Sequence, residues 1–120
     1  MGFQHTLLAE GRWQQLSLIE QLANIGSEVH RAVEWKRRED ADRFLGAFER
    51  ALELFDLTLA DPRWRHRLKE IARSREVFCD TMVGENQYGT PPEAIDKYFM
   101  QFGTAAAIER KRNREQTKHQ

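Results

Sequence analysis

The sequence predicts an all-α protein, an up-down-up-down four-helix bundle that forms one domain. Apolar residues recur at intervals of three and four in four stretches, and residues typical of helix ends separate these stretches. Most of the connections are short, so helices that follow one another in the chain are expected to pack antiparallel. The expected helices cover residues 12–38, 41–60, 62–83 and 91–108.

The first expected helix, over residues 12–38, is predicted to be the centre of the bundle because it carries two apolar seams. The first seam consists of Leu18, Leu22, Ile25, Val29 and Ala32. The second seam, about a quarter-turn away, consists of Leu16, Ile19, Ala23, Gly26, His30 and Val33. Together the seams cover about half of the helix circumference, which is wider than contact with one neighbour requires. The helix should therefore contact neighbours on two sides.

The next two helices are each preceded by an aspartate. Asp40 is a predicted N-cap for the helix over residues 41–60. The apolar face of that helix is Ala41, Phe44, Leu45, Phe48, Leu52, Phe55 and Leu59. Asp61, followed by Pro62 at the first helical position, is predicted to cap the helix over residues 62–83. The stripe of this third helix is Trp64, Leu68, Ile71, Arg75, Phe78 and Met82, in which the arginine is the exception.

The fourth helix, over residues 91–108, is expected to begin with a capping box at Thr90–Glu93 that has prolines in its two middle positions. The residues that follow it are almost all polar or charged, so residues 109–120 are predicted to form a mobile tail. Residues 1–108 then form a single helical-bundle domain, in which residues 1–11 are interpreted as a short cap at one end.

Composition and charge exclude several classes of function. The 120 residues include 19 Lys and Arg and 19 Asp and Glu, so no overall field attracts nucleic acid or an anionic membrane. No stretch approaches the length of about 20 apolar residues that crosses a membrane, and the chain begins without the features of a signal peptide. A single cysteine, Cys79, rules out an intrachain disulfide. We therefore expect a soluble, cytoplasmic protein without membrane association.

Motifs for catalysis and for metal or cofactor binding are absent from the sequence. Di-iron bundles need Glu-x-x-His on two helices. The residues three positions before the four histidines are Gly2, Ser27, Arg63 and Gln116. There is no His-Glu-x-x-His, no pair of cysteines and no Gly-Lys step of a P-loop. No cofactor, no metal site and no catalytic residue are therefore predicted.

Five residues are candidates for an interface between subunits: Trp13, Ala23, Gly26, His30 and Trp35. The two tryptophans are expected to point away from both seams, where they either contact another subunit or cover ends of the bundle. Ala23 and Gly26 permit the close approach of a second helix, within the chain or between chains. His30 is interpreted as a seam histidine with a polar partner, or as a pH-sensitive contact between subunits.

Four residues are candidates for a polar or anion-binding site: Arg75, Glu85, Asn86 and Tyr88. A guanidinium on an apolar stripe needs water, a carbonyl or a carboxylate, because burying it alone is too costly. The candidate acids for Arg75 are Glu28, Glu53, Asp56 and Asp96. The other three candidates lie in a loop between two helix ends, and such loops often carry function. Alternatively, Tyr88 folds over the end of the bundle.

Two short motifs resemble those of known families. Residues 24–28 read Asn-Ile-Gly-Ser-Glu and are followed by Arg31. This resembles the Asn-Ile-Ala-Glu-Gly…Arg signature of the small four-helix-bundle proteins encoded in bacterial ribosomal intervening sequences. The resemblance implies a bundle that forms cyclic oligomers, with nucleic-acid binding in some relatives. Arg114-x4-His119 is similar in form to the Arg-x(4–6)-His motif of HEPN-type helical ribonucleases, where it lies on a packed helix near a dimer interface.

The sequence does not identify a biochemical function, and two hypotheses from different classes follow from it. The leading hypothesis is a bundle that acts by self-association, as a dimer or higher oligomer, and by protein–protein contact without catalysis. The alternative is an RNA-binding or HEPN-like RNA-processing module. Its basic residues would be Arg63, Arg65, Arg67, Lys69, Arg73 and Arg75 of the third helix and Arg110, Lys111, Arg112, Arg114 and Lys118 of the tail.

Overall fold

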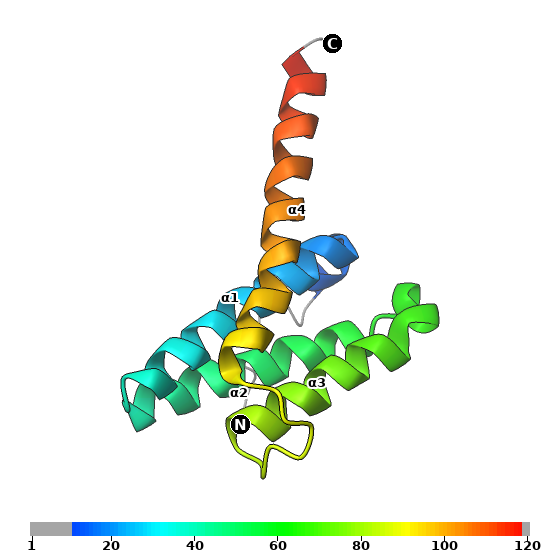
Figure 1. The fold of residues 1–120 in the computed structure, drawn as a ribbon. Helices are drawn as coiled ribbons and strands as arrows, with labels where there is room; N and C mark the ends of the chain where they lie inside the picture. Colours follow the sequence, from blue (N-terminus) through cyan, green and yellow to red (C-terminus); the bar gives the residue numbers. More distant parts are fainter. Residues whose placement is uncertain (1–10, 119–120) are drawn as a thin grey trace.

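The computed structural model describes residues 11–118, and this part of the chain is an all-α four-helix bundle, as predicted (Figure 1). The helices are α1 (Leu18–Arg37), α2 (Ala41–Leu59), α3 (Leu68–Met82) and α4 (Pro92–Lys118). Residues 1–10 of the predicted cap and His119 of the HEPN-like motif lie outside the described residues. No helix within residues 11–118 is both long and apolar enough to cross a membrane.

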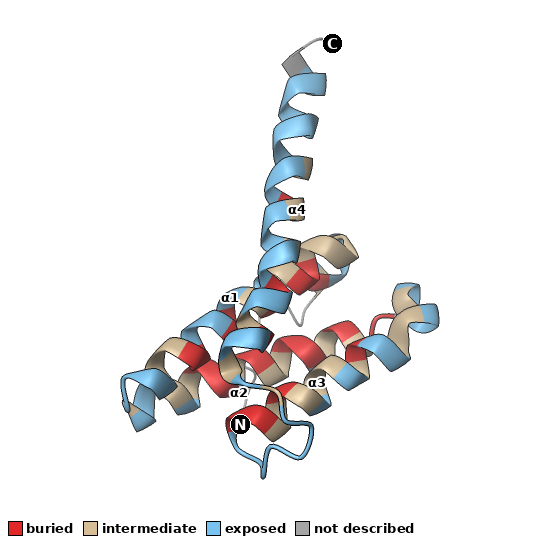
Figure 2. Ribbon diagram, viewed as in Figure 1, coloured by how far each residue is buried: buried red, intermediate tan, exposed pale blue. Residues whose placement is uncertain are grey.

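The helix α1 is central, as its two seams predicted. It packs against α2 and against α4 (Figure 1). On the first seam, Leu22, Ile25 and Val29 are almost fully buried. On the second seam, Gly26 lies against Phe99 of α4. Figure 2 shows the buried residues concentrated where the helices face one another.

The start of α1 differs from the prediction of a helix from residue 12. The helix begins at Leu18 because Ser17 and Glu20 form a capping box. The Glu20 N–H donates to Ser17 Oγ at 3.1 Å, and the Ser17 N–H donates to Glu20 Oε1 at 3.0 Å. Before this cap the chain forms a separate 3₁₀ turn, η2 (Trp13–Gln15), which places Trp13 in the core.

The helix α2 has nearly the predicted limits. Asp40 caps its N-terminus, because one carboxylate oxygen accepts the Arg43 N–H at 3.1 Å. Its phenylalanines pack on rings from other helices, with the Phe48 and Phe78 centroids 5.3 Å apart and the Phe55 and Phe99 centroids 5.8 Å apart. These ring contacts join α2 to α3 and to α4 in one core.

The predicted third helix is divided into two parts. Asp61 does act as an N-cap, but the residues that follow form a 3₁₀ helix, η3 (Pro62–Arg67), and α3 begins only at Leu68. Trp64 leaves the helical conformation, with φ −103° and ψ 23°. Its indole N–H donates to Gln21 Oε1 at 2.9 Å, a tertiary contact that accompanies the change of direction.

The prediction that the last helix ends at residue 108 and gives way to a tail is wrong, because α4 continues to Lys118. The added residues, 109–118, are mostly Glu, Arg, Lys and Gln, which favour helix even without packing, and they include no Gly or Pro. The helix crosses α1 steeply, and its C-terminal half projects beyond the other helices (Figure 1). Ala106 is its last buried residue, and the molecule measures 52 × 28 × 28 Å.

Candidate functional site

An open groove between α1 and α4 brings together three of the five predicted interface residues, Ala23, Gly26 and His30. Its free volume is about 590 Å³, and its remaining lining includes Ser27 on α1 and small residues on α4. Two contacts between α1 and α4 lie at this groove. A Cβ on Gly26 would stand 3.0 Å from the Phe99 Cβ, and His30 Nδ1 lies 3.0 Å from Asp96 Oδ2. The second seam of α1 therefore packs on α4 of the same chain, with open space beside the contact.

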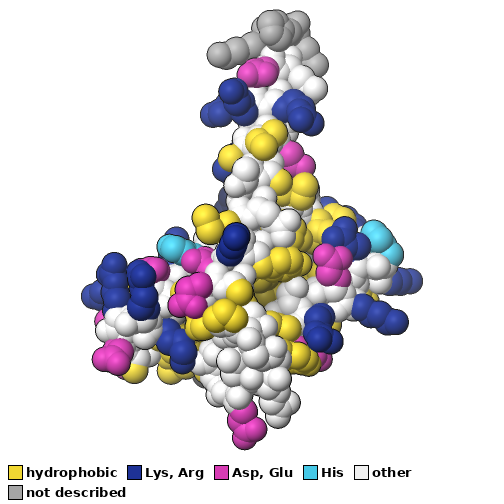
Figure 3. All heavy atoms as spheres, viewed as in Figure 1, with side chains coloured by type: hydrophobic (Ala, Val, Ile, Leu, Met, Phe, Trp, Pro, Cys, Tyr) yellow, Lys and Arg dark blue, Asp and Glu magenta, His cyan; other side chains and the backbone are white. Residues whose placement is uncertain are grey.

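One face of α4 continues this groove along the projecting half of the helix. We call this face the α4 stripe, and its residues are Glu93, Asp96, Met100, Gly103, Thr104, Ala107, Lys111 and Arg114. The spacing of three and four keeps them on one side of the helix. Met100 is 64% exposed, and no atom lies within 4 Å of a Cβ built on Gly103. Figure 3 shows Lys and Arg side chains on the outer part of α4.

The order of residue types along the α4 stripe is acidic, small or apolar, and then basic. The acids are Glu93 and Asp96, at the helix N-terminus where negative charge is stabilised. The bases are Lys111 and Arg114, near the C-terminus where positive charge is stabilised. Sequence reasoning missed this face because residues 109–120 were predicted to be a tail.

The two tryptophans do not form an interface surface. Trp13 is completely buried, which contradicts the expectation that it points away from the core. Trp35 is half-buried and packs against the core, with the Arg43 guanidinium 4.6 Å and the Arg38 guanidinium 5.5 Å from its ring. Trp35 therefore covers the connection between α1 and α2, which was one of the two predicted roles.

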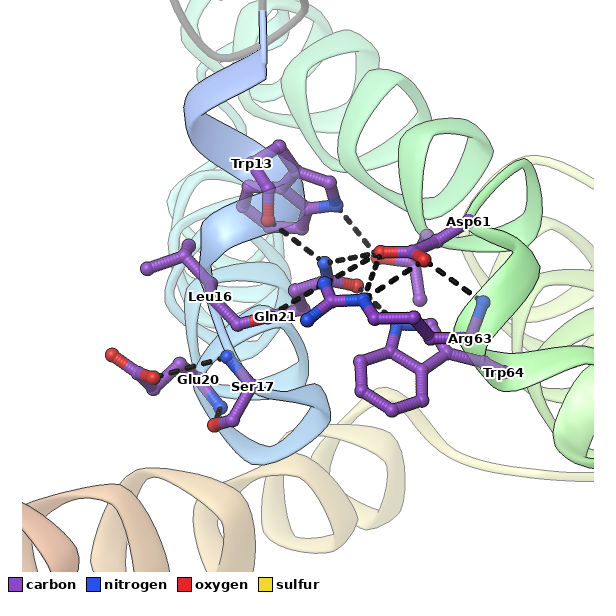
Figure 4. Close-up of polar contacts among 9 residues, drawn as sticks. Trp13, Leu16, Ser17, Glu20, Gln21, Asp61, Arg63 and Trp64 are labelled. Carbon is purple, nitrogen blue, oxygen red and sulfur yellow. Dashed lines mark hydrogen bonds and ion pairs between the residues drawn. The ribbon is translucent and has the colours of Figure 1, made fainter.

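Trp13 belongs to a buried polar network that the sequence did not reveal (Figure 4). Its indole N–H donates to Thr58 Oγ1 at 3.1 Å. The Gln21 amide donates to the Trp13 carbonyl at 2.9 Å and to Asp61 Oδ2 at 3.1 Å, while its oxygen accepts from Trp64. Gln21 and Thr58 are fully buried, and every one of these groups has a partner. The network is a structural clamp, because its members bond to one another across η2, α1, α2 and η3.

Asp61 is the charged centre of that clamp. Its carboxylate caps η3 by accepting the Arg63 N–H at 3.1 Å, and Arg63 Nη2 donates to Asp61 Oδ2 at 2.7 Å. The same guanidinium donates to the Leu16 carbonyl at 2.8 Å. The side-chain hydrogen bond from Arg63 is the main reason that the pKa of Asp61 lies below its usual value.

The four predicted polar-site residues are not brought together. Arg75 pairs with Asp56 of α2, one of its four candidate acids, with Arg75 Nε 3.0 Å from Asp56 Oδ1. Glu85 and Asn86 are exposed in the loop after α3. Tyr88 belongs to the same loop, and its ring lies against another part of α3, 4.5 Å from the Arg73 guanidinium.

Asp80 fixes the shape of that loop. Its carboxylate accepts the Gln87 N–H at 2.8 Å and the Tyr88 N–H at 3.1 Å. Gly84 is needed at the start of the loop, because a Cβ there would stand 2.9 Å from the Asp80 Cα. The Tyr88 hydroxyl donates to Glu76 Oε2 at 3.3 Å, so the ring is held against α3 at both ends.

A cleft between α3 and α4 is the second open space on α4. It holds about 290 Å³ and is lined mainly by apolar side chains, including Val77, Ile95 and Phe99. Arg73 and Tyr98 lie at this cleft as well. Its position depends on the direction in which α4 leaves the loop, so no signal in the sequence could have located it.

The described residues contain no arrangement for metal or thiol chemistry. No group of three His, Cys, Asp or Glu within residues 11–118 is placed to hold a metal ion. Burial raises the pKa of the Cys79 thiol, so this thiol is protonated at neutral pH.

Comparison with known proteins adds no relative: no family model, no curated protein and no solved structure matches the chain. The resemblance of residues 24–28 to the ribosomal intervening-sequence proteins therefore stays a prediction.

Proposed function

We propose that this protein acts by self-association, as an antiparallel dimer in which the α4 stripes of two copies pair, and that it has no catalysis of its own. The observation that carries the proposal is the order of charges along the α4 stripe. A stripe that is acidic at one end and basic at the other complements an antiparallel copy of itself. A symmetric pair also closes after two subunits, because the same surface is used on both.

The register of such a pair follows from the positions of the charges. If the pair is centred between Gly103 and Thr104, Lys111 faces Asp96 of the partner subunit. Within each chain Asp96 also pairs with His30 at 3.0 Å, so the charge complementarity rests mainly on Glu93 and Arg114. In the same register, Arg114 faces Glu93 of the partner subunit. Small residues then lie at the crossing point, where they permit close approach of the two helices. Antiparallel helices also place opposite ends of their dipoles together.

The groove beside the α4 stripe gives the second helix more surface than α4 alone offers. Ala23 and Ser27 of α1 line the same groove as Met100 and Ala107 of α4. A helix laid along the α4 stripe would therefore contact α1 too and cover Met100, which is 64% exposed. Covering apolar surface of this kind is what stabilises homodimers.

The test is the solution mass of the full chain, measured by light scattering after size exclusion over a range of concentrations. Arg114→Glu should shift the protein toward the monomer, because it places an acid opposite Glu93 of the partner subunit. Glu93→Lys alone should do the same, and the two changes together should restore the dimer. Raising the salt concentration should weaken the pair, because Glu93, Lys111 and Arg114 are exposed.

Arg112→Glu is the matched control. It makes the same change of charge on the same exposed part of α4, but it lies about 100° around the helix from Lys111. This variant should keep the mass of the unmodified chain. A monomer at all concentrations, or a dimer that Arg114→Glu and Arg112→Glu weaken equally, would overturn the proposal.

Nothing in the site favours the RNA-related alternative. Three of the basic residues that it needs are in ion pairs: Arg63 with Asp61 at 2.7 Å, Arg67 with Glu70 at 2.9 Å and Arg75 with Asp56 at 3.0 Å. Because these charges are neutralised within the chain, they contribute little to a phosphate-binding face. The alternative stays a prediction, and retention of the protein on RNA at low salt is its test.

A further inference from the structure

We propose that the cleft between α3 and α4 binds a small amphipathic carboxylate, with its apolar body in the cleft and its carboxylate on Arg73. The cleft is lined by the α3 side of α4, whereas the α4 stripe borders the groove on the α1 side. The inference therefore stands apart from the proposed dimer, and either can fail alone.

The cleft is open because α4 diverges from α3 and because short side chains line it at the middle. Ser74 on α3 and Ala94 on α4 both belong to its lining. The resulting volume of about 290 Å³ is at the lower end of the range for small-molecule sites. A small ligand is therefore the size class that fits.

The interior of the cleft is suited to an apolar group. Val77, Ile95 and Phe99 provide hydrocarbon surface, and the last two are almost fully buried. The Ser74 hydroxyl donates to the Glu70 carbonyl at 3.1 Å, so its hydrogen is already used within α3. The side chains of Val77, Ile95 and Phe99 offer no polar atom to an ordered water, which needs two or more polar partners.

Arg73 is the residue that binds the carboxylate of the proposed ligand. Its guanidinium is held over the Tyr88 ring at 4.5 Å, and the ring is itself fixed by Glu76 and Asp80. Within residues 11–118 no carboxylate forms an ion pair with Arg73, in contrast to Arg67 and Arg75, which are both paired. A guanidinium held in this way presents a planar fork that matches a carboxylate.

The acidic residue at the cleft does not prevent a carboxylate from binding there. Glu70 also lines the cleft, but its Oε2 accepts from Arg67 Nε at 2.9 Å. Its charge is therefore balanced by a neighbour on the same side of the molecule. The remaining charge at the cleft is the positive charge of Arg73, which favours an anionic ligand over a cationic one.

The experiment is an NMR titration of the full chain with octanoate, observed at the methyl groups of Val77 and Ile95. Octanol is the uncharged control ligand. Octanoate should shift both methyl signals in a saturable manner, and octanol should bind at least about tenfold more weakly, since a bond to a charged group is lost. Ala94→Trp, which fills the cleft from an exposed position, should abolish the shifts.

Three arginine variants complete the test. Arg73→Met should weaken octanoate binding at least about tenfold, and Arg73→Lys should weaken it less, because the charge stays but the fork is lost. Arg65→Met removes an exposed arginine outside the cleft and should leave the affinity unchanged. Circular dichroism confirms that each variant is folded. Absence of shifts at both methyls, or equal losses in Arg73→Met and Arg65→Met, would overturn the inference.

Discussion

Gly26 of α1 and Phe99 of α4 are in direct contact where the two helices cross. A Cβ on Gly26 would stand 3.0 Å from the Phe99 Cβ and 3.3 Å from its carbonyl oxygen. Gly103, on α4 itself, has no atom within 4 Å of the corresponding position. A side chain therefore has no room at Gly26 but has room at Gly103, although both glycines lie inside helices.

Replacing the two glycines by alanine should change stability in opposite directions. Gly103→Ala should stabilise the fold by about 0.5–1 kcal/mol, because alanine favours helix and nothing obstructs it. Gly26→Ala gains the same preference for helix, but the added methyl group pushes α4 away from α1, at a cost of about 1–3 kcal/mol. Urea unfolding measures both effects, in the Arg114→Glu background so that self-association does not contribute. Equal stabilisation by both changes would show that the helices are not in contact at Gly26.

Asp61 should make the stability of the fold depend on pH in the acidic range. Its pKa is lowered in the folded state, mainly by Arg63, so its contribution is complete above the unfolded value of about 4 and is lost as the pH falls through the folded value. Asp61→Asn should cost about 1–2 kcal/mol at neutral pH, and the difference from the unmodified chain should disappear in acid. Unfolding midpoints between neutral pH and acid measure this. A difference that is constant with pH would contradict the role of the charge.

Thr58 should be required to satisfy the indole of Trp13. Thr58→Val keeps the shape of the side chain but removes the hydroxyl that accepts the buried Trp13 indole N–H. The expected loss is about 1–3 kcal/mol, the cost of leaving a buried donor unpaired. Thr117→Val is the control, since Thr117 is exposed and its hydroxyl bonds only to its own helix. Similar losses in thermal unfolding for both variants would count against the clamp.

Asp80 should protect two amide hydrogens in the loop after α3. Asp80→Ala removes the acceptor of the Gln87 and Tyr88 N–H groups, and hydrogen exchange at both should become faster. Asp80→Asn keeps one acceptor oxygen and should preserve the protection of one amide only. Exchange rates that do not respond to Asp80→Ala would mean that the loop is held by other contacts.

Much of the fold could be predicted from local patterns. The caps at Asp40 and Asp61 and the apolar face of residues 41–60 depend on neighbouring residues alone, and they predicted α2 almost to its ends. The capping box of Ser17 and Glu20 was equally local and was missed, because the apolar periodicity extends past it toward Arg12. The end of α4 was missed for a different reason. Polar residues without a packing partner suggested a tail, although their helix propensity is high.

The candidate sites depend on contacts between distant residues, so the sequence could indicate them only in part. The cost of burying a charge left water, a carbonyl or a carboxylate as partners of Arg75, and the choice of Asp56 required the direction of α3. The role of Arg73 depends on Tyr88, and the cleft beside it depends on how α4 leaves the loop. Ala23, Gly26 and His30 were identified from their seam, whereas the neighbour that covers this seam is 66 residues away.

The central position of α1 has a consequence for the order in which the helices pack during synthesis. During synthesis, α1 leaves the ribosome first among the helices, and α2 follows at once and covers one seam. The other seam must wait for α4, which follows α1, α2 and α3 in the chain. A newly made chain therefore presents Gly26 and its neighbours to the surroundings until α4 has been made. Chains of different length lie side by side on a polysome. The α4 of a longer chain can then pack on the second seam of α1 in a neighbouring chain that has not yet made its own α4. An exchange of α4 between chains is thus the specific assembly error to which this topology is exposed.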